Sequence, residues 1–180
     1  YHAGSTVPIL VDGDVTVWES LAIMEYVADR FPDKAIWPKD FKARAFARVI
    51  ANEMHAGFRG LRAACPMNVR KRYAEMDRGE LVAKDVTRST SILKSALERF
   101  GKPSGEGPFL FGAFTAADAM YAPLVSRFQT YSIKVDPVIR AYMDAIFDHP
   151  AFVEWHKAAM ENTQIVPHDE VDEPSIGAFR

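Results

Sequence analysis

A β-hairpin pattern opens the chain, and it limits the possible folds more than any other feature. A continuous apolar run covers Val7 to Val11, a turn signal follows at Asp12-Gly13-Asp14, and a β-branched run covers Val15 to Trp18. Pro8 cannot donate to a strand ladder, so it predicts an edge or a strand start. Because two strands alone are marginally stable in water, the hairpin must pack on another part of the chain.

A helix is predicted directly after the hairpin. Ser20 is a typical N-cap residue, and apolar side chains follow at helical spacing up to Phe31. Pro32 disfavours helical backbone at the residue before it, so the helix is expected to end there. Residues 1–33 therefore form a small α/β unit, and residues 34–39 a proline-containing linker.

After the linker, the strand pattern disappears and the chain is expected to be mainly α-helical. The predicted helical stretches are Asp40 to Ala64, Glu80 to Phe100, Thr115 to Tyr131, Asp136 to Phe147 and Pro150 to Met160. We assign residues 40–161 to one all-helical domain. Residues 162–180 are polar and contain proline, so they are expected to be a poorly ordered tail.

Composition excludes several classes of protein. The formal net charge of -2 over 180 residues gives no general affinity for nucleic acid. A single cysteine excludes an internal disulfide framework and fits a reducing compartment, so we expect a cytoplasmic protein. No apolar run approaches the roughly 20 residues of a membrane span, so no membrane partner is expected.

Most reactive residue types have structural interpretations. The histidines and Cys65 lack the spacing of a zinc site, so no metal is expected. Cys65 is interpreted as a buried, inert thiol rather than a reactive one. Thr115 and Asp118 form a capping box, which is a folding signal. A basic run is interpreted as a solvated face rather than an anion-binding surface, and it comprises Arg44, Arg48, Arg59, Arg62, Arg70, Lys71 and Arg72.

Glu19 and Ser20 lie where the second strand meets the helix, and they form the candidate site. A helix N-terminus offers unpaired N–H groups to a carboxylate, Ser20 adds a hydroxyl, and Glu19 can accept from an ammonium. Together they suit an α-amino-acid group. If the Val7-Pro8 bond is cis, the backbone of Val7 would be free to bind an extended peptide. The simpler alternative is a plain N-cap at Ser20 and a surface charge at Glu19.

The segment "VPILVDGDVTVWESLAIMEYVADRFPDKAIWP" strongly resembles the second half of the thioredoxin-like domain of glutathione transferases. The segments "NEMHAGFRGLRAACPMNVRKRY" and "FLFGAFTAADAMYAPLVSRF" resemble the helical domain of a bacterial group in that superfamily. The resemblance extends to about Met160. It implies a mainly α fold, with a partial thioredoxin-like α/β N-terminal portion followed by the family's all-helical C-terminal domain.

The resemblance also implies roles for individual residues. Pro8 would be cis, and the backbone of Val7 would bind the cysteinyl part of glutathione. Glu19 and Ser20 would hold its γ-glutamyl group. The helical domain would supply a pocket for an electrophile, for which the candidates by position are Met54, His55, Phe58 and Arg62. Thr115 and Asp118 match the family's folding signal.

This chain departs from the family in two places. Many relatives carry a basic residue before Val-Pro, whereas this chain has Thr6. The family's first strand–helix–strand unit carries the Ser, Tyr or Cys that activates the thiol, and it is expected before Tyr1. We therefore assign no catalytic residue within the chain and expect it to be a fragment.

The implied function is glutathione conjugation to a hydrophobic electrophile by a cytoplasmic homodimer, in which glutathione thiolate is the nucleophile. A glutathione-dependent isomerase or a thiol reductase is an alternative within enzymes, and the activating residue would distinguish them. The other alternative is a non-enzymatic binding or regulatory protein of the same fold.

Overall fold

The computed structural model describes residues 7–101, 105 and 107–180, and it begins with the predicted hairpin. Strands β1 (Ile9–Asp12) and β2 (Val15–Trp18) are antiparallel, and their register runs from Ile9 opposite Trp18 to Asp12 opposite Val15. Gly13 takes a φ of 62° in the two-residue loop, a conformation that glycine adopts without steric cost. Helix α1 (Ser20–Arg30) follows, so the predictions of a hairpin and a helix are confirmed.

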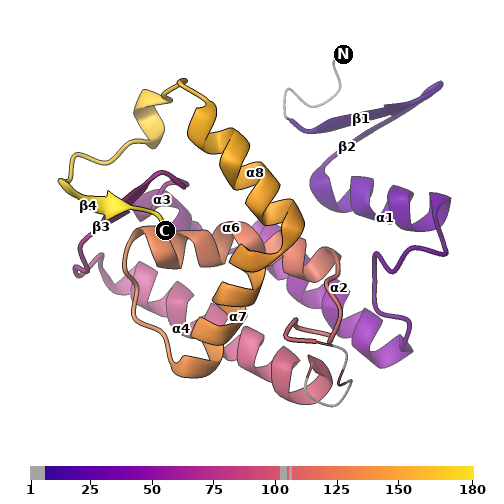
Figure 1. Ribbon diagram of the computed structural model, residues 1–180. Coiled ribbons are helices and arrows are strands. Elements are labelled where there is room, and N and C mark those ends of the chain that lie inside the picture. The colour runs from indigo at the N-terminus through magenta and orange to yellow at the C-terminus, as the bar shows by residue number, and fades with distance from the viewer. Residues whose placement is uncertain (1–6, 102–104, 106) are drawn as a thin grey trace.

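The rest of the chain is mainly helical, and Figure 1 shows how its helices are arranged. Their buried side chains form one hydrophobic core. The elements of this part are α2 (Phe41–Ala56), α3 (Arg59–Ala64), β3 (Lys71–Tyr73), α4 (Glu80–Ala96), the π-helical turn η1 (Leu97–Gly101), α6 (Ala116–Thr130), α7 (Pro137–Asp148), α8 (Pro150–Glu161), the 3₁₀ turn η2 (Pro167–Asp169) and β4 (Ser175–Ala178). No helix among the described residues is both long and apolar enough to cross a bilayer.

The predicted helix from Asp40 to Ala64 is interrupted after Ala56. Phe58 adopts a left-handed conformation, with a φ of 56°, and begins a separate short helix. Gly57 is the C-cap of α2 and has extended backbone angles, with a φ of -104° and a ψ of -166°. In this conformation a Cβ would lie 2.6 Å from the carbonyl oxygen of Glu53, so the position suits glycine. The sequence prediction missed this break because one glycine is often tolerated within a helical pattern.

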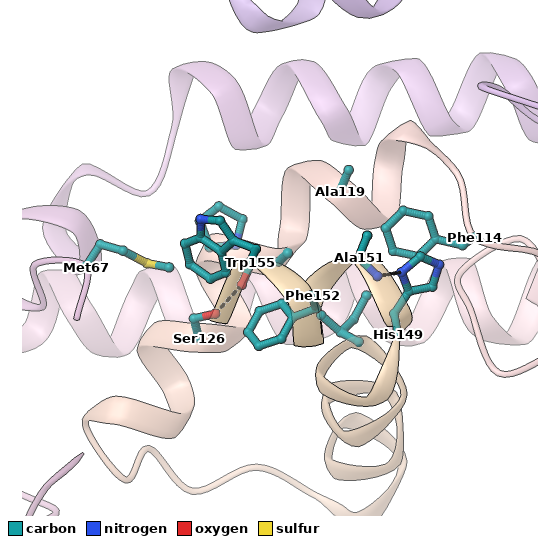
Figure 2. Close-up of a pocket in the computed structure, with 11 residues that line it drawn as sticks. Met67, Phe114, Ala119, Ser126, His149, Ala151, Phe152 and Trp155 are labelled. Atoms are coloured by element: carbon teal, nitrogen blue, oxygen red, sulfur yellow. Dashed lines mark hydrogen bonds between the residues drawn. The ribbon is translucent and has the colours of Figure 1, made fainter. Parts of the chain in front are cut away.

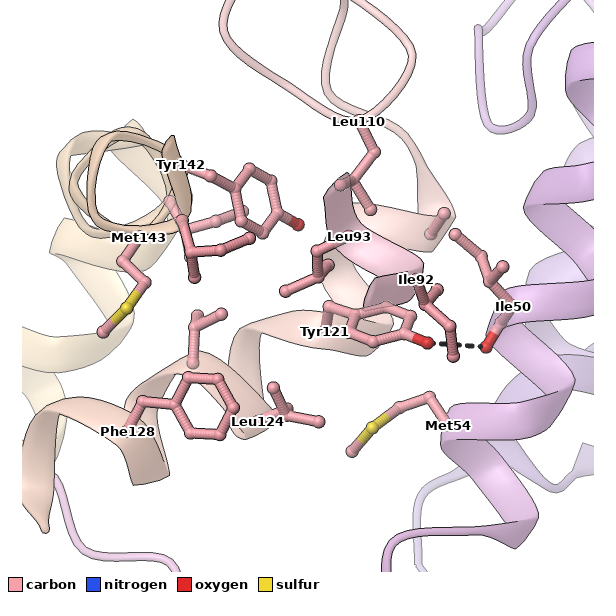
Figure 3. Packing of buried hydrophobic residues seen from close by; sticks show 14 of the residues in the cluster. Ile50, Met54, Ile92, Leu93, Leu110, Tyr121, Leu124, Phe128, Tyr142 and Met143 are labelled. Atoms are coloured by element: carbon pink, nitrogen blue, oxygen red, sulfur yellow. Dashed lines mark hydrogen bonds between the residues drawn. The ribbon is translucent and has the colours of Figure 1, made fainter. Parts of the chain in front are cut away.

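Helix α6 lies at the centre of the core (Figure 3). Tyr121, Leu124 and Phe128 on α6 are fully buried. The hydroxyl of Tyr121 donates to the carbonyl of Ile50 on α2 at 3.2 Å. Phe128 and Leu124 lie with Met143 of α7 in the same cluster. Burying several large side chains of this kind is the main source of stability in a domain of this size.

The capping box predicted at Thr115 and Asp118 begins α6. The carboxylate of Asp118 is fully buried and accepts from the backbone N–H of Thr115 at 2.8 Å and from its hydroxyl at 3.0 Å. Leu110 N–H and the hydroxyl of Tyr142 also donate to it, at 3.1 and 3.2 Å. Burial raises the pKa of Asp118 to about 6, and these donors oppose the rise. The carboxylate therefore joins three parts of the chain.

The C-terminal tail is ordered, contrary to the sequence prediction. Strand β4 pairs antiparallel with β3, a strand that the sequence also failed to predict. Phe179 is 1% exposed and packs between Phe147, Phe152 and His156. The polar composition of the tail concealed this contact, because one large aromatic residue is fully buried in a segment whose other described side chains are exposed or only partly buried.

Ion pairs attach the tail to the rest of the chain, and one of them involves Lys71 of the predicted basic run. Glu173 accepts from Arg78 through both carboxylate oxygens, at 2.9 and 2.7 Å, and the Arg78 side chain is almost fully covered. Glu170 pairs with Lys71 at 2.7 Å. Arg70 donates to the carbonyl of Ala159 at 3.0 Å. Arg70 and Lys71 of the predicted basic run therefore have separate structural partners, as does Arg78, which lies outside that run.

The N-terminal unit, residues 7–31, packs on the helical part through a narrow contact. Leu21, Met24 and Ala28 of α1 pack against the core, although no residue of α1 is itself buried. Arg48 of α2 donates twice to Glu25 of α1, at 2.8 and 2.7 Å. In Figure 1 the hairpin and α1 accordingly lie at one side of the helical part.

Candidate functional site

Four predicted site residues lie at the open end of the hairpin. The β1–β2 ladder ends with Ile9 opposite Trp18. Val7 and Pro8 directly precede Ile9, and Glu19 and Ser20 directly follow Trp18, so both pairs of residues leave the hairpin at this end. The Val7-Pro8 bond is cis, as the resemblance implied. Val7 is exposed and lies outside the ladder.

Glu19, rather than Ser20, is the N-cap of α1, which corrects the sequence prediction. Ser20 is already the first helical residue. Glu19 has a φ of 68° and a ψ of 122°, and this positive φ is uncommon for a residue with a side chain. Its carboxylate does not cap the helix. Among the residues that the structure describes, no side chain accepts from the N–H groups of Leu21 and Ala22 in the first turn of α1, so a ligand could bind there.

Residues from two other helices border this helix N-terminus. The Nε2 atom of His55, in the last turn of α2, lies 3.5 Å from Oε2 of Glu19. The hydroxyl of Ser20 lies 4.0 Å from the sulfur of Met120 on α6. The Glu19 side chain is 51% exposed and that of His55 39% exposed, so both reach solvent.

The four predicted electrophile contacts separate into two pairs. Met54 is 1% exposed and Phe58 is 5% exposed, and both belong to the core. Because both side chains are buried, direct contact with a ligand is not expected, and we no longer propose them as pocket residues. His55 and Arg62 lie near the surface, and Arg62 Nη1 donates to the carbonyl of His55 at 3.5 Å.

Cys65 is fully buried in the core, as the sequence predicted. Burial raises the pKa of its thiol to about 11, although the nearby Arg78 and Arg127 favour the thiolate. A thiol with this pKa is almost entirely protonated at neutral pH and cannot serve as a nucleophile.

An apolar cavity of about 270 Å³ lies between α6 and α8, away from the predicted electrophile contacts (Figure 2). Phe114, Phe152 and Trp155 supply its aromatic lining. The two polar side chains in the lining have local partners, because Ser126 donates to Ala122 and His149 accepts from the N–H of Ala151. The cavity suits an apolar occupant. Sequence patterns could not identify it because its lining comes from separate elements.

Comparisons with known proteins agree on one family. The profile described as "Glutathione S-transferase, N-terminal domain" matches residues 2–29, and that described as "Glutathione S-transferase, C-terminal domain" matches residues 83–158. A glutathione S-transferase from Triticum aestivum is 27% identical over 171 residues, which cover 94% of this chain and 75% of the wheat protein. A probable maleylacetoacetate isomerase from Caenorhabditis elegans is 26% identical over 149 residues, covering 82% of this chain and 67% of that protein.

A solved structure shares the fold. It is a glutathione transferase homologue from Burkholderia with bound glutathione, and it superposes with a TM-score of 0.66 at 22% identity. The match covers 87% of this chain and 74% of that one. The chain spans only 47% of the length of two plant relatives, Protein IN2-1 from Zea mays and its homologue from Oryza sativa. With the N- and C-terminal profiles matching in order and the fold shared, this chain belongs to the glutathione S-transferase superfamily.

Proposed function

We propose that this chain is part of a glutathione-dependent transferase and binds glutathione at the open end of the hairpin. The observation that carries the proposal is the uncapped N-terminus of α1 beside the exposed carboxylate of Glu19. Family membership supports it, as does the glutathione bound in the Burkholderia homologue.

The site matches the chemistry of the γ-glutamyl group. The free N–H groups of α1 and the hydroxyl of Ser20 suit its carboxylate, and the Glu19 carboxylate suits its ammonium. The backbone of Val7 would pair with the cysteinyl residue as a short added strand. Each end of the zwitterion would therefore meet a group of opposite charge or polarity.

The reaction that we propose is attack of glutathione thiolate on a hydrophobic electrophile. Lowering the pKa of the thiol generates the nucleophile, and holding both reactants side by side accelerates their reaction. We assign the activating role to no described residue of this chain. Cys in that role would indicate isomerase or reductase chemistry, whereas Ser or Tyr would indicate conjugation.

A binding measurement on two variants tests the proposed site. We expect Glu19→Gln to weaken glutathione binding about 10- to 100-fold, because a hydrogen bond to a charged group is lost. We expect Ser20→Ala to weaken it about 5-fold, since a neutral hydrogen bond is worth less. NMR titration of the isotope-labelled 180-residue chain would measure both.

Glu154→Gln is the matched control, because Glu154 is an exposed carboxylate on α8, and it should leave binding unchanged. Unchanged affinity in Glu19→Gln, or shifts of signals remote from α1 only, would contradict the proposal.

Cys65 provides a separate test of the mechanism. Because its thiol is buried and protonated, Cys65→Ala should leave glutathione-dependent turnover of the complete enzyme within about twofold. Turnover of a standard aryl halide by the purified variant would measure this. A large loss of rate in a variant that still folds would show that the thiol takes part in the reaction.

The alternative is a binding or regulatory protein that keeps the glutathione site without turnover. The unpaired first turn of α1 and the exposed Glu19 favour a ligand site in either case, so only an activity assay separates the two. We also propose a cytoplasmic homodimer on the basis of family membership. Light scattering would test the dimer, and a single-chain mass in solution would contradict it.

The divisions at residues 1–33, 34–39, 40–161 and 162–180 stay predictions, and limited proteolysis of the linker would test the first of them.

A further inference from the structure

The contact between Glu19 and His55 connects the N-terminal unit to the helical part at the candidate site. His55 lies in the last turn of α2, and its Nε2 is 3.5 Å from Oε2 of Glu19. Among the described residues, His55 is the one side chain within ion-pair distance of this carboxylate. The other oxygen, Oε1, accepts no hydrogen bond from the part of the chain that the structure describes.

The direction of the Glu19 side chain has a consequence for α1. An N-cap side chain commonly accepts from the N–H groups two or three residues further on, which here belong to Leu21 and Ala22. Glu19 makes no such bond. A carboxylate in that position would occupy the N–H groups that a ligand carboxylate needs. Its approach to His55 keeps those groups open.

The backbone around His55 is itself held in place. Helix α2 ends one residue later, at Ala56, and the N–H of its C-cap residue Gly57 donates to the carbonyl of Glu53 at 2.8 Å. Arg62 of α3 donates to the carbonyl of His55 at 3.5 Å. The end of α2 is therefore restrained from two sides, so that the imidazole stays directed toward α1.

We infer that His55 is a positioning residue for the amino-acid head of glutathione. It holds one oxygen of Glu19 and leaves the other for the ligand ammonium, while the first turn of α1 stays free for the ligand carboxylate. This inference rests on the proposed function. It also moves His55 from the electrophile side, where the sequence placed it, to the glutathione side of the site.

A measurement on the ligand-free chain tests the positioning directly. In His55→Ala the Glu19 carboxylate is released and can cap α1, so hydrogen exchange of the Leu21 and Ala22 amides should slow about 3- to 5-fold. Asn52→Ala, one turn earlier on the exposed side of α2, is the matched control and should leave these rates unchanged. Unchanged or faster exchange in His55→Ala would overturn the inference.

Binding to two ligands then tests the effect on recognition. His55→Ala should weaken glutathione binding about 3- to 5-fold, the size expected for an exposed ion pair. It should not change binding of a glutaryl analogue that lacks the α-amino group, and it should have no effect in a Glu19→Gln background. His55→Gln keeps a side-chain N–H and should bind glutathione within about twofold of the unchanged chain.

Equal losses for both ligands would show a merely structural role for His55 and overturn the inference. If the unchanged chain binds neither ligand, the proposed function is wrong. The exchange rates of Leu21 and Ala22 would then decide on their own whether His55 positions Glu19.

Discussion

Helix α1 of the N-terminal unit contains no buried residue, whereas α6 of the helical part buries nine of its fifteen. Both helices were predicted from the sequence, yet α1 contacts the core through one side only. This difference indicates that burial in the helical part supplies most of the free energy of unfolding. The N-terminal unit, which carries the candidate site, depends on its contact with α2 and α6.

Most stabilising contacts lie in the helical part, whereas the candidate binding site lies mainly in the N-terminal unit. Helices α2, α3, α4, α6, α7 and α8 and strand β3 all contribute buried residues to the core, so its local opening requires the loss of many contacts. The hairpin and α1 are held by three apolar side chains, the pair Arg48–Glu25 and the contact between Glu19 and His55. Local unfolding of the N-terminal unit is therefore expected to require less free energy than unfolding of the helical part.

The largest expected effect comes from the tail. Strand β4 pairs with β3 and Phe179 packs on Phe147, so we expect the tail to unfold together with the helical part. Phe179→Ala should lower the free energy of unfolding by about 3–5 kcal/mol, because it removes a fully buried aromatic side chain. Urea denaturation would measure the loss. Ile176→Ala on the same strand is the control, and its exposed side chain should change stability by less than about 0.5 kcal/mol. A loss below about 1 kcal/mol in Phe179→Ala would show that the tail contributes little to the stability of the helical part.

The next largest effect is a pH dependence that belongs to the helical part. Burial raises the pKa of Asp118 from 3.8 to about 6, so the folded chain holds this proton more tightly than the unfolded chain. The contribution of Asp118 to stability is therefore greatest below pH 4 and falls as the pH rises to about 6. The fall is at most about 3 kcal/mol for two pKa units.

Unfolding curves of the unchanged chain and of Asp118→Asn between pH 4 and 7 would isolate this contribution, because asparagine does not titrate. The stability of the unchanged chain relative to the variant should fall over this range. Parallel pH profiles would show that the carboxylate has the same pKa in the folded and unfolded chains.

The smallest effect lies at the contact between the two regions. Arg48→Ala should lower global stability by no more than about 1 kcal/mol, since the pair with Glu25 is partly exposed. It should nevertheless speed hydrogen exchange of α1 amides, by up to about fivefold, without changing that of α6. Lys42→Ala, an exposed residue of the same helix, is the matched control. Equal acceleration in α1 and α6 would show that the two regions unfold together.

Local patterns in the sequence predicted the features that depend on neighbouring residues. The turn at Gly13 and the capping box of Thr115 and Asp118 were identified because each is specified within four residues. The break at Gly57 was missed because one glycine in a helical pattern does not by itself predict a helix end, and the left-handed backbone of Phe58 cannot be read from the sequence. The strands β3 and β4 were missed because each is short and pairs with a partner about 100 positions away.

The sequence by itself determined the hairpin, the helical pattern and the residue types at the candidate site, because local backbone preference and periodicity decide these. Only the tertiary structure decided that Met54 and Phe58 face the core and that His55 faces Glu19. Met54 and His55 lie in the last turn of α2, and Phe58 is the N-cap of α3, so the rotation of α2 and the break after it set their directions. That rotation results from packing against α6, which no local pattern contains.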